Sequence, residues 1–419
     1  MKPAQRLLAV AYGGGHIAML LPVLQALRSR RPQLQVQLLA LTTARRSALA
    51  AGWDCLGYDS LWHLLQPDER AQALQLGAAL LPHNSHPDIS ERESLAYLGI
   101  NAWSLQHQLG AAAAAQRLEQ RGRQGFHPLE FMTRLLRWLR PHGLLTTNSP
   151  RSEQAALEAA HALAIPSVAV LDLFVRAGDA FAARSVRPTR VCVLAPAVAE
   201  QLRAAGWEES RLAVTGNPAF DCLHESAARQ QAAELRRRWQ IDWGRDPGRL
   251  VLLATQPEVR AHPDSPWPAG DALPLAMEAT TRDWVGQRPQ ASLVVRHHPN
   301  HWHRLPRAAD TPQVHVSVAS QQPVEGLLLA ADAVLVQTST VGLQAAVAGR
   351  PVLSLRCSPG ALWGLDYAAL GVARGVATLE QLPQALDEVL RQPPAATGWA
   401  RPQAAAPAVA AEVEGLLDR

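Results

Sequence analysis

Residues 7–41 constrain the fold of this chain more than any other part of the sequence. A continuous apolar run at 7–11 has the length of a buried strand, and three glycines and a histidine follow it at 13–16. Apolar residues then recur at helical spacing as far as Leu27, and a second apolar run covers 36–41. A strand, a glycine turn, a helix and a second strand make a β-α-β unit. The sequence therefore predicts an α/β protein, with helices on both faces of a parallel sheet.

The same alternation continues along the chain. In the first half, strands are predicted at 143–147, 165–171 and 190–194, with helices at 152–163 and 198–205. After a polar run at 236–249, strands are predicted at 250–254, 292–296, 333–336 and 351–355. Helices are predicted at 275–285 and 340–348, and a third helix is predicted to end at 331. This pattern predicts two Rossmann-like, doubly wound domains facing a cleft. Open sheets of this kind bind their ligands at the carboxyl ends of the strands.

The length of 419 residues favours two domains, since one domain takes about 100–200 residues. We expect an N-terminal domain at 1–217, interrupted at about 60–140 by a mainly helical insertion where the β-α rhythm fails. A second domain is expected at 218–392. An Ala/Pro-rich link and a terminal helix at 409–417 make up the remaining segment, 393–419.

Charge and composition favour a soluble, cytoplasmic protein over a nucleic-acid-binding or membrane-spanning one. The 40 basic and 36 acidic residues give a formal net charge of +4, and Lys2 is the single lysine. That arginine bias is typical of GC-rich bacterial genes, and no basic block with interleaved aromatics indicates a nucleic-acid partner. No run of about 18 apolar residues predicts a membrane span. The four cysteines form no C-x-x-C pair, which argues against a zinc ribbon, and no D-x-D motif precedes a predicted strand end. No metal and no cofactor is expected.

The glycine loop at 13–15 could bring the backbone close to a ligand at the start of a helix, where N–H groups favour an anion. Its spacing matches neither G-x-G-x-x-G nor a P-loop. A purely structural tight turn is the alternative. His16 favours the functional interpretation, because a titratable side chain at the carboxyl end of a strand is well placed to act as a general base.

Two further clusters lie in the second domain. Arg296 and His298 end one predicted strand, and three hydroxyl residues at 338–340 end another and begin a helix. An arginine, an imidazole and a hydroxyl-capped helix terminus together predict a phosphate-binding cradle. Taken singly, His298 could be a core imidazole and Ser339 an ordinary helix cap.

These residues also carry a resemblance. The H-P pair at 298–299, followed by T-S-T-V-G-L-Q-A-A-V-A-G-R-P-V-L at 338–353, resembles the nucleotide-sugar half of GT-B glycosyltransferases. The stretch 211–221 is similar to the V-T-G-N-x-x-x-D stretch of UDP-GlcNAc 2-epimerases. The opening G-G-G-H-I is similar to the acceptor-side loop of the glycosyltransferase that makes lipid II. The resemblance covers about two thirds of the chain and implies a GT-B fold.

The sequence departs from the epimerases at their acid/base positions. Their opening G-T-R-P-E is replaced by the glycine loop, and their H-R-R-E-N would fall at 255–259, without the histidine and arginine. Their Q-E-E becomes Gln344 followed by two alanines. Their carboxylate after the I-P-V strand corresponds to Asp172. Glycosyl transfer is therefore favoured over epimerisation.

The expected function is metal-independent transfer of a sugar from a UDP- or CMP-sugar to a bacterial glycan, lipid-linked or protein acceptor. The alternatives are a UDP-N-acetylhexosamine 2-epimerase, hydrolysing or not, and a non-catalytic sugar-nucleotide-binding protein. Peripheral membrane contact, oligomeric state, the sugar and the stereochemistry stay open. His16 and Asp172 are the candidate catalytic residues. The candidate substrate-binding residues are Gly13, Gly14, Gly15, Thr255, Gln256, Arg296, His298, Thr338, Ser339, Thr340 and Gln344.

Overall fold

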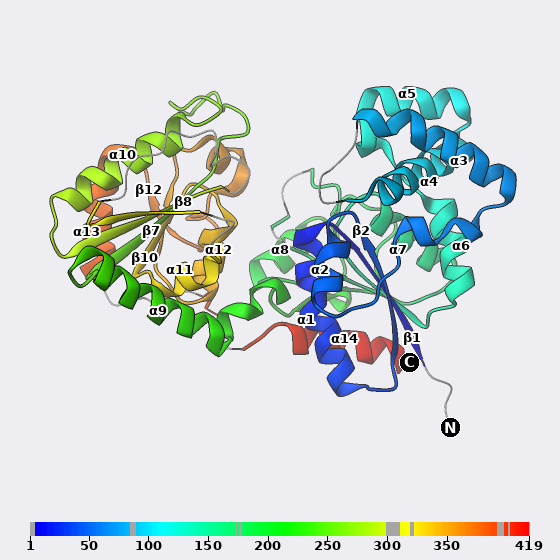
Figure 1. Cartoon of the computed structure of the whole chain (residues 1–419), viewed down its shortest axis with the longest axis horizontal. Coiled ribbons are helices and arrows are strands. Elements are labelled where there is room, and N and C mark those ends of the chain that lie inside the picture. Colours follow the sequence, from blue (N-terminus) through cyan, green and yellow to red (C-terminus); the bar gives the residue numbers. More distant parts are fainter. Residues whose placement is uncertain are drawn as a thin grey trace. The chain divides into compact units, whose positions relative to one another are not determined.

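The chain forms two compact units, each built around its own parallel sheet (Figure 1). Unit 1 comprises Met1–Asp221 and Ala404–Arg419, and unit 2 comprises Cys222–Gln403. The computed structural model describes residues 5–83, 89–172, 174–175, 178–298, 311–318, 322–391, 398–400 and 403–418. Pro299 of the H-P pair and the predicted link at 393–396 lie outside these residues.

The sheet of unit 1 confirms the predicted parallel arrangement. Its strand order is β2-β1-β3-β4-β5-β6, and every neighbouring pair is parallel. The strands are β1 (Arg6–Tyr12), β2 (Gln35–Leu41), β3 (Gly143–Thr147), β4 (Ser167–Val170), β5 (Arg190–Val193) and β6 (Leu212–Val214). Because the strands are parallel, their carboxyl ends lie along one edge, where the glycine loop follows β1.

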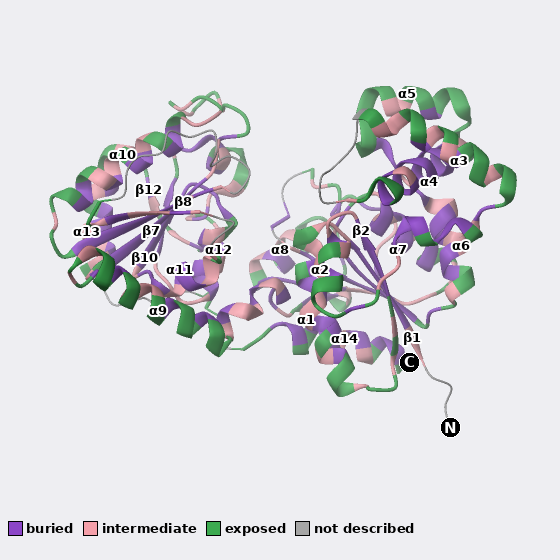
Figure 2. Cartoon of the chain, in the orientation of Figure 1, coloured by how far each residue is buried: buried purple, intermediate pink, exposed green. Residues whose placement is uncertain are grey.

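Helices cover both faces of this sheet. The main ones are α1 (Gly14–Arg30), α2 (Ala44–Ala50), α7 (Ser152–Ala162), α8 (Pro196–Ala204) and α14 (Ala406–Leu417). One face packs against α1 and α14 through a core that includes Leu20, Leu24 and Val409. The other face packs against α7 and the helices within residues 60–140. Figure 2 shows the strands buried between these layers.

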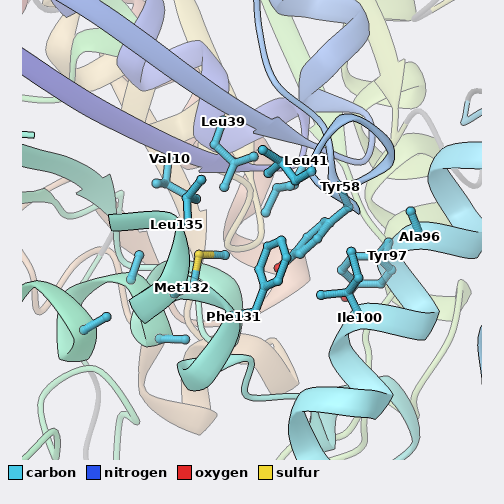
Figure 3. Close-up of a cluster of buried hydrophobic side chains, with 14 of the residues drawn as sticks. Val10, Leu39, Leu41, Tyr58, Ala96, Tyr97, Ile100, Phe131, Met132 and Leu135 are labelled. Carbon is cyan, nitrogen blue, oxygen red and sulfur yellow. The ribbon is translucent and has the colours of Figure 1, made fainter. Parts of the chain in front are cut away.

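The described part of residues 60–140 contains four α-helices: α3 (Pro67–Leu80), α4 (Glu91–Leu109), α5 (Ala111–Arg121) and α6 (Leu129–Leu139). Their apolar side chains join the sheet in one buried cluster, in which Phe131 and Met132 meet Val10 and Leu39 (Figure 3). The Tyr58 ring lies 5.2 Å from the Phe131 ring, measured between centroids. The insertion is therefore part of the core of unit 1.

Unit 2 repeats the architecture. Its strand order is β12-β11-β10-β7-β8-β9, again all parallel. The strands are β7 (Arg249–Thr255), β8 (Ala291–His297), β9 (Val314–Ser317), β10 (Ala333–Val336), β11 (Val352–Leu355) and β12 (Arg374–Val376). The main helices are α9 (Ser226–Trp243), α10 (Ala272–Gly286), α11 (Val324–Ala330), α12 (Thr340–Val347) and α13 (Leu382–Arg391).

Helix α9 covers much of the polar run at 236–249, where no helix was predicted. Only Ala228, Ala232 and Trp239 of its 18 residues are buried, so its apolar periodicity is weak. The edge strands β6, β9 and β12 were also not predicted as strands, because each is short and only partly buried. None of the described helices combines the length and the apolar character that crossing a bilayer requires.

Candidate functional site

The glycine loop joins the carboxyl end of β1 to α1. Gly13 has a φ of 87°, which residues with a side chain rarely adopt, and α1 begins at the next residue. The Gly14 N–H donates to Thr43 Oγ1 at 3.1 Å, whereas a side chain at Gly15 would meet no atom within 4 Å. The loop is therefore an ordered turn with an open outer surface.

His16 lies in the first turn of α1 and is half-buried. Its Nδ1 is 2.6 Å from the hydroxyl oxygen of Thr147, the last residue of the neighbouring strand β3. The Thr147 hydroxyl also donates to Glu153 Oε2 at 2.6 Å. The carboxyl edge of the sheet thus places His16 at one end of a hydrogen-bonded chain.

Glu153 is the buried end of that chain. It lies in the first turn of α7 and is fully buried, and its carboxylate accepts the N–H groups of Tyr12 at 2.8 Å and Thr147 at 2.7 Å. Burial raises the pKa of Glu153, while the positive charge of a protonated His16 and these hydrogen bonds act in the opposite direction. The carboxylate therefore ties the ends of β1 and β3 to the start of α7.

Asp172 follows β4 and is half-buried at the same edge. Its carboxylate accepts a hydrogen bond from Asn148 Nδ2 at 2.7 Å. Its carbonyl accepts one from Asn217 Nδ2 at 3.0 Å, which joins the 211–221 stretch to the end of β4. The structure therefore places Asp172, like His16, at the carboxyl edge of the sheet in unit 1.

A buried arginine lies behind this edge. Arg184 Nη2 donates to the carbonyls of Asn148 and Ser149, at 3.1 and 3.2 Å. Burial lowers the pKa of Arg184 to about 10, and Glu153 is the largest opposing charge. At neutral pH the guanidinium therefore stays charged beside the buried carboxylate.

In unit 2, the loops after β7, β10 and β11 are held together by Gln337 and Glu258. The Gln337 amide donates to the Gln256 carbonyl at 2.8 Å and to Glu258 Oε1 at 3.0 Å. Glu258 Oε2 accepts the Gly360 N–H at 3.0 Å. Burial raises the pKa of Glu258. Glu258 therefore connects the loops at the carboxyl edge of the sheet in unit 2.

Five predicted residues lie at or near the start of α12. Gln256 Nε2 donates to Thr338 Oγ1 at 2.8 Å. Ser339 is the N-cap of α12, and its hydroxyl accepts the Val341 N–H at 3.4 Å. Thr340 begins the helix and is exposed, and Gln344 lies one turn further on and is half-buried. The structure thus brings these hydroxyl and amide groups to one end of one helix.

The end of β8 differs from the expectation. Arg296 Nη1 donates to Ser317 Oγ at 2.8 Å and to the Gln322 carbonyl at 2.7 Å. These bonds hold the guanidinium beside β9, which competes with the predicted binding of a diphosphate. His298 is half-buried and follows the last residue of the strand.

Thr255 also has an internal partner. Its hydroxyl lies 3.1 Å from Nδ1 of His297, which is buried, and His297 Nε2 is 3.3 Å from Glu278. Burial lowers the pKa of His297. The two adjacent histidines therefore differ in exposure: His297, the last residue of β8, is buried, whereas His298, which follows the strand, is half-buried.

Sequence reasoning did not select Thr147 or Glu153. Glu153 is an acidic residue in a first helical turn, where acids are common, and Thr147 is a β-branched residue at a strand end. Nothing in either pattern distinguishes a relay from ordinary helix and strand chemistry. Among the described residues, no group of three His, Cys, Asp or Glu side chains is placed to hold a metal ion.

No protein-family model matches the sequence, and no curated protein matches it significantly. Solved structures do share the fold over the whole chain. UDP-GlcNAc 2-epimerase from Neisseria meningitidis, with UDP-GlcNAc bound, is 14% identical with a TM-score of 0.60, over 99% of this chain and 100% of that one.

Two other solved structures have the same overall fold. The UDP-GlcNAc 2-epimerase of Methanocaldococcus jannaschii is 12% identical with a TM-score of 0.58, over 98% of this chain and 100% of that one. The glycotransferase of kitacinnamycin is 17% identical with a TM-score of 0.51, over 99% and 94%. The chain therefore has the two-sheet α/β fold shared by these epimerases and GT-B glycosyltransferases, as its sequence predicts.

Proposed function

We propose that this protein is a nucleotide-sugar glycosyltransferase in which His16 is the general base. The observation that carries the proposal is the position of His16 at the carboxyl edge of the sheet in unit 1. Its Nδ1 forms a hydrogen bond with the hydroxyl group of the buried Thr147. A half-buried imidazole held in this way can present its other nitrogen to a substrate hydroxyl. The fold supports a nucleotide-sugar substrate, since UDP-GlcNAc is bound to the Neisseria enzyme of the same fold.

In the proposed reaction, the acceptor hydroxyl oxygen attacks the anomeric carbon of the donor sugar. The hydroxyl proton passes to His16 Nε2, and the bond between the anomeric carbon and the phosphate oxygen breaks. Its electron pair leaves with the nucleotide. In unit 2, His298, the hydroxyl groups of Thr338 and Ser339, and the N-terminus of α12 would meet the charge on the phosphate. Asp172 would orient the sugar or acceptor through the carboxylate oxygen that Asn148 does not bind.

The direct experiment incubates the protein with a panel of UDP- and CMP-sugars and a membrane or glycan extract as acceptor source. We expect nucleotide release that depends on acceptor and that falls about a hundredfold or more in His16→Gln, the usual scale of general-base catalysis. Release of free sugar without acceptor would instead support a hydrolase. Nucleotide binding without turnover would support the non-catalytic alternative.

A 2-epimerase is the second candidate, and the fold comparison favours it. The two epimerases above have TM-scores of 0.60 and 0.58, against 0.51 for the glycotransferase. Epimerisation needs acid/base groups on both faces of the sugar at C2. Of the three candidates, His16, Asp172 and Glu258, the last is engaged by Gln337 and Gly360. Incubation with UDP-GlcNAc in D₂O decides the matter, because only an epimerase would incorporate deuterium at C2.

A further inference from the structure

We infer that Glu153 is a positioning residue that sets the tautomer of His16 through the Thr147 hydroxyl. This inference rests on the proposed function only for its purpose, since the hydrogen-bonded chain is a property of unit 1 itself. The two links are both 2.6 Å, from His16 Nδ1 to Thr147 Oγ1 and from Thr147 Oγ1 to Glu153 Oε2. Thr147 and Glu153 are fully buried, so water does not compete for the link between them.

The number of hydrogens determines the direction of the chain. A threonine hydroxyl carries one hydrogen, and an ionised carboxylate can only accept. Thr147 must therefore donate its hydrogen to Glu153 and accept one from His16. His16 then carries its proton on Nδ1, which leaves the lone pair of Nε2 available as a base.

The surroundings of Glu153 favour the ionised state that this argument needs. Its carboxylate receives three donors: the Tyr12 N–H, the Thr147 N–H and the Thr147 hydroxyl. Arg184 adds a buried positive charge nearby. These groups oppose the effect of burial, which raises the pKa of Glu153.

The opposite tautomer requires a different proton count. If Thr147 donated to His16 Nδ1, its oxygen would face Glu153 Oε2 at 2.6 Å with no hydrogen between them, unless Glu153 were protonated. His16 would then carry its proton on Nε2 and could not act as a base there. The position of one proton thus separates the two arrangements, and NMR can measure it.

The experiment records two-dimensional ¹H–¹⁵N spectra of the full-length protein labelled with ¹⁵N-histidine, with His16 assigned by the signal that His16→Gln removes. We expect the neutral Nδ1–H tautomer in the unmodified protein. Thr147→Ser keeps the hydroxyl and should keep that tautomer. Thr147→Val removes the hydroxyl, and the signals should move towards a mixture of tautomers.

Thr146→Val is the matched control. Thr146 precedes Thr147 in β3 and is equally buried, but its hydroxyl has no hydrogen-bond partner among the described residues. We expect this variant to leave the His16 spectrum unchanged. If Thr147→Val fails to fold, the inference is tested by the His16 tautomer in Thr147→Ala and in the unmodified protein.

The Nε2–H tautomer in the unmodified protein would overturn the inference, and so would an unchanged spectrum in Thr147→Val. These measurements need no substrate, so they stand even if no sugar transfer is found. If transfer is found, Thr147→Val should lower kcat about tenfold or more with little change in the donor KM, because the base is misdirected while the nucleotide site is intact. If the unmodified protein shows the Nδ1–H tautomer but transfers no sugar in the assay, the result would count against the proposed function alone.

Discussion

Three buried glutamates join segments of chain that are far apart in sequence. Glu153 accepts N–H groups from the ends of β1 and β3, and Glu258 joins the loops after β7, β10 and β11. Glu93 accepts the N–H groups of Tyr58 and Asp59 at the base of the helical insertion. A buried carboxylate is stable only when such donors replace its water. We therefore expect each of the three to contribute to the free energy of unfolding by an amount that depends on pH.

Glu93 gives the clearest pH dependence. Burial raises its pKa from an ordinary value of 4.5 to about 7, while Arg45 lies 3.5 Å away and Asp59 is a neighbouring acid. Between these two values the folded protein holds a proton that the unfolded chain has released. Stability should therefore be greatest below pH 4.5 with respect to this group, and should fall as the pH rises to about 7.

Urea unfolding of the protein at pH 5, 6 and 7.5 measures this effect, with Glu93→Gln as the variant. The variant loses one acceptor and should be less stable at pH 5, but its free energy of unfolding should decline less between pH 5 and 7.5. Parallel declines in the two proteins would contradict the assignment.

The candidate site could be predicted only in part from the sequence. His16, Asp172 and the hydroxyl residues at the start of α12 lie at strand ends, as predicted from the order of apolar runs. The partners of Arg296 and Thr255 could not be predicted, because Ser317 and His297 reach them through neighbouring strands. Sequence patterns report the position of a residue along a strand, whereas hydrogen bonds across strands depend on register.

At the scale of elements, α3 and α4 pack with their backbones in close contact. A Cβ built on Gly77 would lie 2.5 Å from the Leu95 carbonyl oxygen, and one on Gly99 would lie 2.1 Å from that of Ala73. Neither helix can move away easily, because the apolar residues of α4 are buried in the core of unit 1. The two glycines are therefore needed for the packing of the insertion.

We predict that Gly99→Ala destabilises the protein by about 1–3 kcal/mol, the usual cost of overpacking. Gly415→Ala is the matched control, since Gly415 is also helical but a Cβ there meets nothing within 4 Å. It should gain up to about 1 kcal/mol from the higher helix propensity of alanine. Denaturant unfolding measures the free energy of unfolding of both variants. An equal change in the two would contradict the packing argument.

The strongest strands and helices were predictable because their burial leaves an unbroken apolar run or a clear periodicity. Strand β3 spans the predicted residues, and α7 differs at its end by a single residue. Helix α9 could not be recognised in this way, because most of its surface is exposed (Figure 2). Its three buried positions give too weak a period to distinguish it from a polar linker.

At the scale of the whole molecule, the chain leaves unit 1 after Asp221 and returns to it at Ala404. The returning helix α14 buries Val409, Val413 and Leu416 in the core of unit 1. Glu414 pairs with Arg30 at 2.6 Å, and Asp221 accepts the N–H groups of Ala405 and Ala406. The first unit is therefore completed only by the last residues of the chain.

We predict that a chain ending at Gln403 loses the fold of unit 1 and keeps that of unit 2. The apolar residues of α14 each contribute about 1.5–3 kcal/mol when buried, and the total stability of a domain is only about 5–15 kcal/mol. Hydrogen exchange measured by mass spectrometry should show β1 and β3 losing protection while β7 and β10 retain it. Retained protection in β1 and β3 would contradict this account of α14.

The proposed function requires that unit 2 bind a nucleotide phosphate at the carboxyl ends of β8 and β10, and calorimetric titration with UDP, and with CMP in parallel, tests this most directly. We expect His298→Ala and Ser339→Ala each to weaken binding by roughly 1.5–3 kcal/mol, the value of a charge-assisted hydrogen bond. The double variant should lose less than the sum, because both residues would contact one phosphate. Lower melting temperatures with unchanged nucleotide affinity would contradict the claim and leave Ser339 as a helix cap only.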